Sequence, residues 1–172
     1  MSLGLKRGTV QLEAHDKQWD ETAAQTIKTL KSILGDDAID IQHIGSTAIP
    51  AIKAKPIIDI AVGVDDLDRV LLHNEQLQQE GIFYRGSDVE HQLLYVMGDM
   101  EKDTRTHHIH VVKWNGTEWN NYIHFRDYLN ANENAALQYQ KLKEELESKY
   151  AGDRIGYTSG KQNMIDNILN RK

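Results

Sequence analysis

The chain has 172 residues, of which 40% are hydrophobic and 27% charged, as expected for one ordinary globular domain with a substantial core. Its net charge of −6 (20 basic minus 26 acidic residues) argues against a general nucleic-acid binder, which needs a broad basic face. The lack of cysteine excludes disulfides, thiolate catalysis and cysteine-ligated metals. No run of 18 apolar residues is present, so we predict a cytoplasmic protein without membrane contact, and the oligomeric state stays open.

The first third of the chain predicts one long helix between short strands. Residues 9–13 alternate in polarity and predict a first strand. Asp16 is a good helix N-cap, and apolar residues then recur at helical spacing as far as Gly35. Residues 39–44 alternate again. Residues 57–64 are almost entirely apolar, which is typical of a strand covered on both faces, and the two prolines between these strands allow only about one helical turn.

The remainder predicts more strands and then only helices. A second helix opens at Asp65 and ends at Gly81, and strands follow at residues 82–85, 92–97 and 106–114, with a polar loop at 98–105. Helices are expected over residues 119–129 and 132–150, then a connector over 153–158 and a last helix capped by Thr158 or Ser159. This order predicts an α+β domain with a central mixed sheet of about five strands, flanked by helices, and a C-terminal helical segment.

Asp59 is the only ionisable residue within the apolar strand 57–64. A buried carboxylate is costly unless it is ligated or paired. As a metal ligand, Asp59 would hold Mg²⁺ or Mn²⁺ against a triphosphate; as a structural residue, it would pair with Lys53 or Lys55. Both interpretations stay open from the residues alone.

Gly45, Ser46 and Thr47 follow the strand 39–44 and form a second candidate feature. Glycine lets the backbone approach a ligand closely, and exposed amides beyond a strand bind anions. The hydroxyl groups of Ser46 and Thr47 add donors. The alternative is an ordinary turn at the end of a strand.

A histidine-rich strand supplies further candidates. His108 and His110 are two residues apart and therefore share one face, whereas His107 takes the other. The pair would bind a metal, with Zn²⁺ favoured if histidine is a ligand, act as acid or base, or bond a phosphate. We expect His43, near Gly45, to converge on the same cleft.

Basic side chains are needed to offset phosphate charge, although most lysines and arginines are simply solvated. Tyr157 and Lys161 are four residues apart at the start of the last helix and predict a small shared patch. The basic candidates for phosphate contact are Lys53, Lys55, Arg105, Arg126 and Lys161.

Four stretches together resemble the GrpB family, also described as the dephospho-CoA kinase/protein-folding accessory domain family. HIGSTAIPAIKAKPIIDIAV is similar to its signature HIGSTxVPGLxAKPIIDIxV, and THHIHVV to its histidine strand. HFRDYLNANENAALQYQKLKEELESKY and YTSGK resemble its helical segment and its ending. The resemblance covers nearly the whole chain, from Val10 to the last helix.

The resemblance implies a nucleotidyltransferase fold. In active members, a Gly-Ser pair precedes a strand with Asp-x-Asp or Asp-x-Glu, and a third carboxylate completes a site for two divalent metals and a nucleoside triphosphate. Here Ala61 replaces the second carboxylate, and His108 and His110 stand on the later strand. Two Mg²⁺ ions held ~4 Å apart need several anionic oxygens. Either one metal binds through Asp59 and one or both histidines, or a phosphorylated ligand binds without the standard chemistry.

Three hypotheses follow. The first is a divergent nucleotidyltransferase-like enzyme, in which the nucleotide lies against Gly45 and Ser46, Asp59 holds one cation, Lys55 or Arg105 offsets phosphate charge, and His108 or His110 is second ligand or proton carrier. The second is a non-catalytic domain that binds a nucleotide, a CoA precursor or a partner protein. The third is a metal-dependent phosphohydrolase built on Asp59, His108 and His110.

Overall fold

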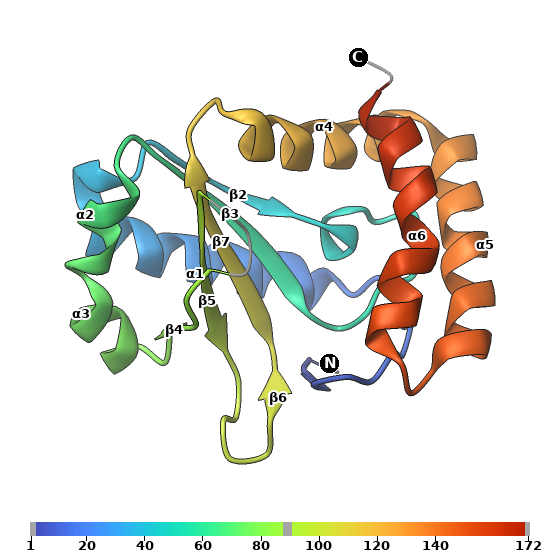
Figure 1. The fold of residues 1–172 in the computed structure, drawn as a ribbon, viewed down its shortest axis with the longest axis horizontal. Coiled ribbons are helices and arrows are strands. Elements are labelled where there is room, and N and C mark those ends of the chain that lie inside the picture. Colours follow the sequence, from blue (N-terminus) through green and yellow to red (C-terminus); the bar gives the residue numbers. More distant parts are fainter. Residues whose placement is uncertain (1–2, 88–90, 171–172) are drawn as a thin grey trace.

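The computed structural model describes residues 3–87 and 91–170 and has a five-stranded mixed sheet at its centre (Figure 1). Its strand order is β2-β3-β7-β5-β4. Only the β3–β7 pair is parallel; the other neighbours are antiparallel. The strands are β2 (Asp40–Ile44), β3 (Ile58–Val64), β4 (Phe83–Tyr84), β5 (Gln92–Met97) and β7 (His107–Lys113).

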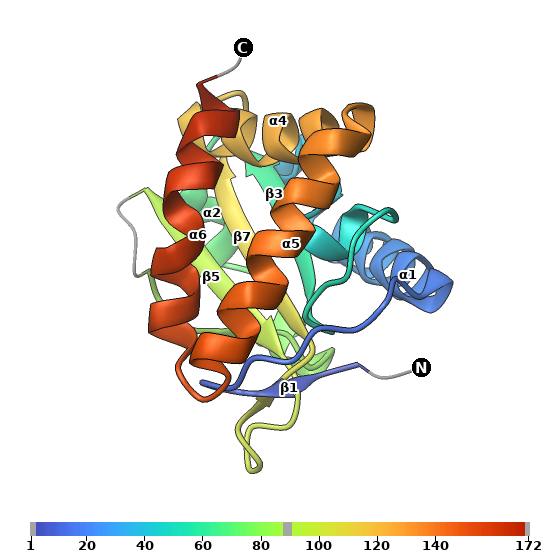
Figure 2. The same ribbon diagram turned by 90° about the vertical axis from the view of Figure 1, so that its right-hand side faces the viewer.

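Six α-helices of the described residues cover the sheet. The helices α1, α2 and α3 pack on one face, where they share the largest hydrophobic core with the strands. On the opposite face Trp119 of α4 packs against the sheet, and α5 and α6 lie side by side with α4 crossing above them (Figure 2). The helices are α1 (Lys17–Leu34), α2 (Leu67–Leu71), α3 (Asn74–Gln79), α4 (Thr117–Ala131), α5 (Glu133–Tyr150) and α6 (Arg154–Leu169). No helix of the described ranges is long and apolar enough to cross a membrane.

The sequence predicts α1 correctly because its local signals agree. The Asp16 carboxylate accepts a hydrogen bond from the Gln18 amide, as an N-cap does, and Gly35 ends the helix with a φ of 54°. Trp19, Ala23 and Leu30 form its buried face. The structure therefore confirms both the capping and the periodicity that predict this helix.

Strand β3 carries Asp59, and its pairing with β7 decides which histidines lie beside that carboxylate. Ile58, Ile60 and Val62 belong to the core under α1, whereas Ala61 belongs to the cluster under α4. The parallel register sets Asp59 beside His108 and Ala61 beside His110. The period of two along each strand therefore brings the carboxylate and both imidazoles to the face covered by α4, α5 and α6.

His107 lies on the other face, as its spacing predicts. Its Nε2 and the Thr26 hydroxyl of α1 are 3.0 Å apart, and its Nδ1 is 2.9 Å from the Thr106 hydroxyl. Burial lowers the pKa of His107 to about 4, so this imidazole is neutral at pH 7.

The predicted strand at residues 9–13 is wrong. Only Glu13 pairs there, in an isolated bridge with Ala54. The first strand is instead β1 (Leu5–Lys6), which pairs with β6 (Thr104–Arg105) in a separate two-stranded sheet. The second part of this small sheet lies within the predicted polar loop. Two-residue strands depend on a distant partner and leave too short a pattern to be predicted.

The second predicted helix is divided into α2 and α3. At the break, the Nε2 of His73 lies 2.8 Å from a carboxylate oxygen of Asp37, and Arg69 donates to the same carboxylate. Asp37 follows α1 in the chain, so these contacts join segments more than 30 residues apart. The local periodicity of the sequence therefore does not predict the break between α2 and α3.

The predicted connector at residues 153–158 is also wrong, because α6 already begins at Arg154. The Asp153 carboxylate accepts from the Gly156 amide and is the true N-cap, so Thr158 and Ser159 lie inside the helix. Glycine normally disfavours a helix interior. Here a Cβ at Gly156 would lie 2.6 Å from Tyr150, and one at Gly160 would lie 2.5 Å from Leu146. Close packing of α6 on α5 thus outweighs the local propensity.

Candidate functional site

A cavity of about 600 Å³ lies between the sheet and the helices α4, α5 and α6. Four separate segments of the sheet layer reach it: the end of β2, the start of β3, and the strands β5 and β7. Side chains of all three helices close it. Its lining residues are Ile44, Gly45, Ser46, Thr47, Lys55, Ile57, Asp59, Gln92, His108, His110, Glu118, Asn121, Tyr122, Phe125, Tyr139, Arg154, Thr158, Lys161, Ile165 and Leu169.

Asp59 is held by the two histidines that its register brings to it. His110 Nε2 lies 3.3 Å and His108 Nδ1 lies 3.7 Å from the same carboxylate oxygen, Oδ1. Burial alone would raise the pKa of Asp59, but the hydrogen bond with His110 and the charges of His108, His110 and Lys55 lower it to about 2. Burial lowers the pKa of His108 to about 4. The centre at pH 7 is therefore a carboxylate beside a neutral imidazole.

A chain of hydrogen bonds sets the tautomer of His110. The Tyr122 hydroxyl donates to Oε1 of Gln92 (3.1 Å), which turns the amide nitrogen of Gln92 toward Nδ1 of His110 (2.9 Å). Since that nitrogen donates, Nδ1 accepts, and Nε2 carries the proton that it donates to Asp59. Both ring nitrogens are thus engaged, so His110 orients Asp59 and offers no free lone pair.

Gly45 is required by the close approach of the backbone to Asp59. Its φ of 73° and ψ of −172° lie in a region that is open essentially only to glycine. A Cβ built on it would lie 2.7 Å from Oδ2 of Asp59. The Gly-Ser turn and the carboxylate are therefore packed together, as the pattern of the sequence predicts.

The substitution Gly45→Ala is expected to lower the free energy of unfolding by about 1–3 kcal/mol from backbone strain, with a further loss from the contact with Asp59. Urea denaturation measures it. Gly81→Ala is a matched control, because Gly81 has a similar φ of 77° but nothing within 4 Å of the added Cβ. Equal losses for both variants would contradict the proposed packing of Gly45 on Asp59.

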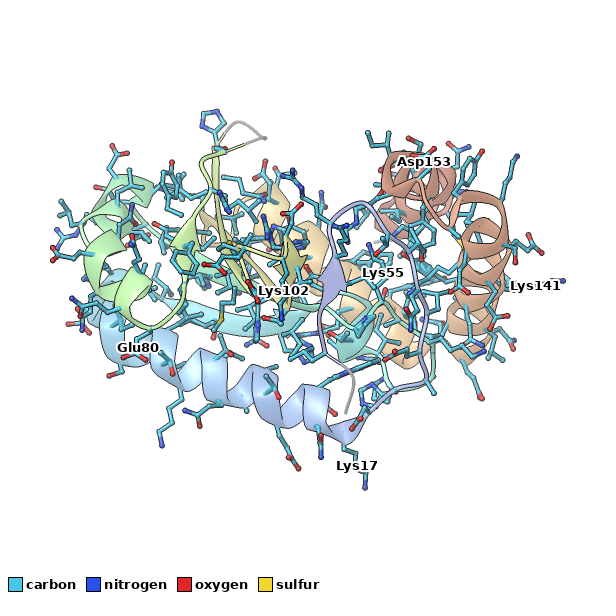
Figure 3. The ribbon with its side chains drawn as sticks, turned by 90° about the horizontal axis from the view of Figure 1, so that it is seen from below. Lys17, Lys55, Glu80, Lys102, Lys141 and Asp153 are labelled. Atoms are coloured by element: carbon cyan, nitrogen blue, oxygen red, sulfur yellow. The ribbon has the colours of Figure 1, made fainter. Side chains whose placement is uncertain are left out.

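Basic side chains gather at the end of the cavity formed by α6 and the start of β3. The ammonium groups of Lys55 and Lys161 lie 5.3 and 4.7 Å from the centroid of the Tyr157 ring. In Arg154, Nε and Nη2 are buried without a hydrogen-bond partner in the part of the chain that the structure describes. Figure 3 shows Lys55 between the sheet and the C-terminal helices. This basic end consists of Lys55, Arg154 and Lys161.

The basic end is electrostatically unfavourable by itself. Burial, and then repulsion from Lys55, lowers the pKa of Lys161 to about 7. Burial and the charge of Arg154 lower the pKa of Lys55. Lys143, behind the cavity wall, donates to the Lys53 carbonyl and has its pKa lowered chiefly by burial. Like charges buried this close are stabilised by an anion among them.

Several predicted residues do not reach the cavity. His43 faces α1, with its ring near Asp20 and 2.9 Å from the Thr47 hydroxyl. Arg105 pairs with Asp103 at 3.2 Å and is buried in β6. The expected convergence of His43 on this cleft is therefore wrong, and Arg105, expected to offset phosphate charge, does not line the cavity. Tyr157 lies behind the ammonium groups, so it supports the basic end without lining it.

Two further basic candidates, Arg126 and Lys53, bind other parts of the chain and do not line the cavity. Arg126 donates to Gln42 and to the carbonyl of His43. Lys53 pairs with Glu144 at 3.3 Å, so the alternative that Asp59 pairs with Lys53 is wrong. Of Lys53 and Lys55, Lys55 is the one whose charge lowers the pKa of Asp59.

Sequence reasoning missed Arg154, Gln92, Tyr122 and Tyr139, which also line the cavity. Arg154 fell within the predicted connector. A signal was nevertheless present, because Arg154, Thr158 and Lys161 follow the i, i+4, i+7 spacing of one helix face. Once α6 is extended to its true start, this stripe is evident.

The side chains present do not fit a two-metal centre. Asp59 is a single carboxylate, and two divalent ions need several anionic oxygens. Among the residues with described positions, no group of three His, Asp or Glu side chains is arranged to hold a metal ion. His108 and His110 instead both approach one oxygen of Asp59. A single metal bound by Asp59, His108 and His110 stays a prediction.

The mixed sheet and the helices around it form a nucleotidyltransferase-like fold. Cid1, solved in complex with its short product ApU, superposes with a TM-score of 0.56 over 87% of this chain and 48% of Cid1. At 16% sequence identity, this likeness concerns the fold alone.

Within this class, the chain belongs to the GrpB family, since the model described as GrpB protein matches residues 9–171. The glutamate-rich protein GrpB of Alkalihalophilus pseudofirmus is 41% identical over 171 residues, which cover 98% of each chain. The crystal structure of the conserved protein GrpB from Enterococcus faecalis superposes with a TM-score of 0.83 at 27% identity, over 94% of this chain and 98% of that one. Other curated relatives are longer, and the chain spans 44–65% of five of them.

Proposed function

We propose that this protein binds a nucleotide or a similar phosphorylated small molecule in the cavity between the sheet and α4–α6. The observation that carries the proposal is the meeting of the Gly45-Ser46 turn with Lys55, Arg154 and Lys161 around one cavity. Backbone amides at a glycine turn and basic side chains are the two kinds of group that proteins use to hold phosphates. The phosphates are assigned to this basic end.

The rest of the cavity suits a base or another partly apolar group. Phe125, Ile165 and Leu169 supply apolar surface, while Asn121 offers an amide group that can orient a ligand. Binding sites for small molecules combine such apolar walls with a few polar groups. A cavity of about 600 Å³ is within the range of ligand sites.

Binding without transfer is favoured over the two catalytic hypotheses. Ala61 removes one carboxylate of the usual pair, and both ring nitrogens of His110 are engaged by Gln92 and Asp59. Neither a two-metal transfer centre nor a hydrolase metal site formed by His110 agrees with these contacts. The second hypothesis, a binding domain, is therefore preferred.

Calorimetry and thermal unfolding against nucleoside mono-, di- and triphosphates and CoA precursors test the proposal. A ligand at about 100 times its Kd stabilises the native state by about 2.7 kcal/mol. For a domain of this size, this corresponds to a rise in Tm of roughly 5–10 °C. Arg154→Gln is expected to abolish the rise, whereas Arg85→Gln, at an exposed arginine, leaves it unchanged. If no phosphorylated ligand of the panel binds, the proposal is wrong.

A further inference from the structure

We propose that the basic end formed by Lys55, Arg154 and Lys161 is a polyphosphate subsite that works without a divalent metal. This inference rests on the proposed function and names how the ligand's phosphates are neutralised. The class of ligand is a molecule with a di- or triphosphate group. In this arrangement Asp59 repels the phosphates instead of binding them through a metal.

The balance of charge supports this subsite. Fully protonated, Lys55, Arg154 and Lys161 carry three positive charges, and Asp59 supplies one negative charge, so two positive charges remain. Nε and Nη2 of Arg154, which have no hydrogen-bond partner among the described residues, add two free donors at the same end. A guanidinium group with two adjacent donors matches two oxygens of a phosphate. A diphosphate or triphosphate supplies both the missing charge and the acceptors.

The surroundings of Asp59 support the same conclusion. Its Oδ1 accepts a hydrogen bond from Nε2 of His110 and lies near His108, while its Oδ2 is packed against Gly45. A metal ion at Asp59 would have to displace these contacts. Divalent ions would also be repelled by the charge of Lys55, which acts on the same carboxylate. The lysines and the arginine therefore take the role that metal ions have in two-metal sites.

Phosphate binding is coupled to proton uptake by Lys161. Lys55, Arg154 and Lys143 face this ammonium as like charges, and Asp59 faces it as the opposite charge. With a pKa of about 7, Lys161 is largely neutral at pH 8 in the free protein. A bound polyphosphate favours its charged form. Affinity is therefore highest below pH 7 and falls as the pH rises above it, and binding at pH 8 takes up a proton.

The test is calorimetry with inorganic tripolyphosphate as the probe, in EDTA and in excess Mg²⁺, at pH 6.5 and pH 8. We expect binding in EDTA that is at least as tight as in Mg²⁺, because the magnesium complex carries less negative charge. Asp59→Asn should tighten binding, since a repelling charge is removed. Lys161→Met should weaken it by roughly tenfold or more, the effect of one charged hydrogen bond. Lys141→Met is the control, because Lys141 points outward from α5 (Figure 3).

Two further measurements make the outcome unambiguous. Lys161→Arg retains its charge at pH 8 and should keep the affinity seen at pH 6.5, and circular dichroism verifies that each variant is folded. Tripolyphosphate binding that requires Mg²⁺ and is lost in Asp59→Asn would overturn the inference. If nucleotides still bind with Mg²⁺ in that case, the proposed function stands. If tripolyphosphate binds in EDTA but no nucleotide does, the subsite stands and the proposed nucleotide ligand is wrong.

Discussion

The double substitution Lys55→Gln/Lys161→Gln is expected to reduce the affinity for a nucleoside triphosphate by about 100-fold or more, because each charged hydrogen bond contributes about 1.5–3 kcal/mol. Both side chains line the same end of the cavity, so one phosphate chain contacts both. Calorimetry on the wild type and the variant measures the change. The fold should persist, because the substitution removes two mutually repelling ammonium groups.

The matched control for this variant is Lys28→Gln/Lys141→Gln. Lys28 on α1 and Lys141 on α5 are exposed, so the control removes the same net charge away from the cavity. Exposed charges are screened by salt and act weakly on a distant ligand. If both double variants lose the same affinity, binding depends on overall charge, and the localised phosphate end is refuted.

The substitution Ile60→Ala is expected to destabilise the protein by about 2–5 kcal/mol, the usual cost of removing a buried isoleucine side chain. Ile60 is 0% exposed and lies in β3, between His43 of β2 and Ile109 of β7. For a domain of this size, Tm should fall by roughly 5–20 °C. Thermal unfolding followed by circular dichroism gives the value.

Ile155→Ala provides the comparison at the opposite extreme, since Ile155 is 80% exposed. Its effect should stay within about 0.5 kcal/mol, as for surface substitutions in general. A similar loss of stability in both variants would mean that β3 is not at the centre of the core.

Elements with agreeing local signals were predictable from the sequence. The helix α1 has a cap, a periodic apolar face and a closing glycine, and β3 is an almost entirely apolar run of the right length. The prediction failed where packing decides the structure. Residues 154–158 of α6 contain a glycine that disfavours a helix in isolation, yet Gly156 and Gly160 allow the helix to approach Tyr150 and Leu146.

Part of the candidate site was predictable from the alternation of side chains along the strands. The period of two places His108 and His110 on one face of their strand, and Asp59 and the Gly-Ser turn can both be recognised from the residues. His43 was expected in the cleft because it is close in sequence to Gly45, but alternation puts it on the α1 side with Ile41, opposite to Ile44. Arg105 failed because β6 belongs to a different sheet. Such placements depend on tertiary pairing, which a single sequence does not contain.

The two faces of the central sheet differ in the side chains that they carry. The largest apolar core lies under α1, α2 and α3, while the carboxylate, the imidazoles and the basic end lie on the other face. Substitutions that reshape the cavity face thus leave most of the stabilising core untouched. Selection can therefore alter what this scaffold recognises, in small steps, without first having to rescue its folding.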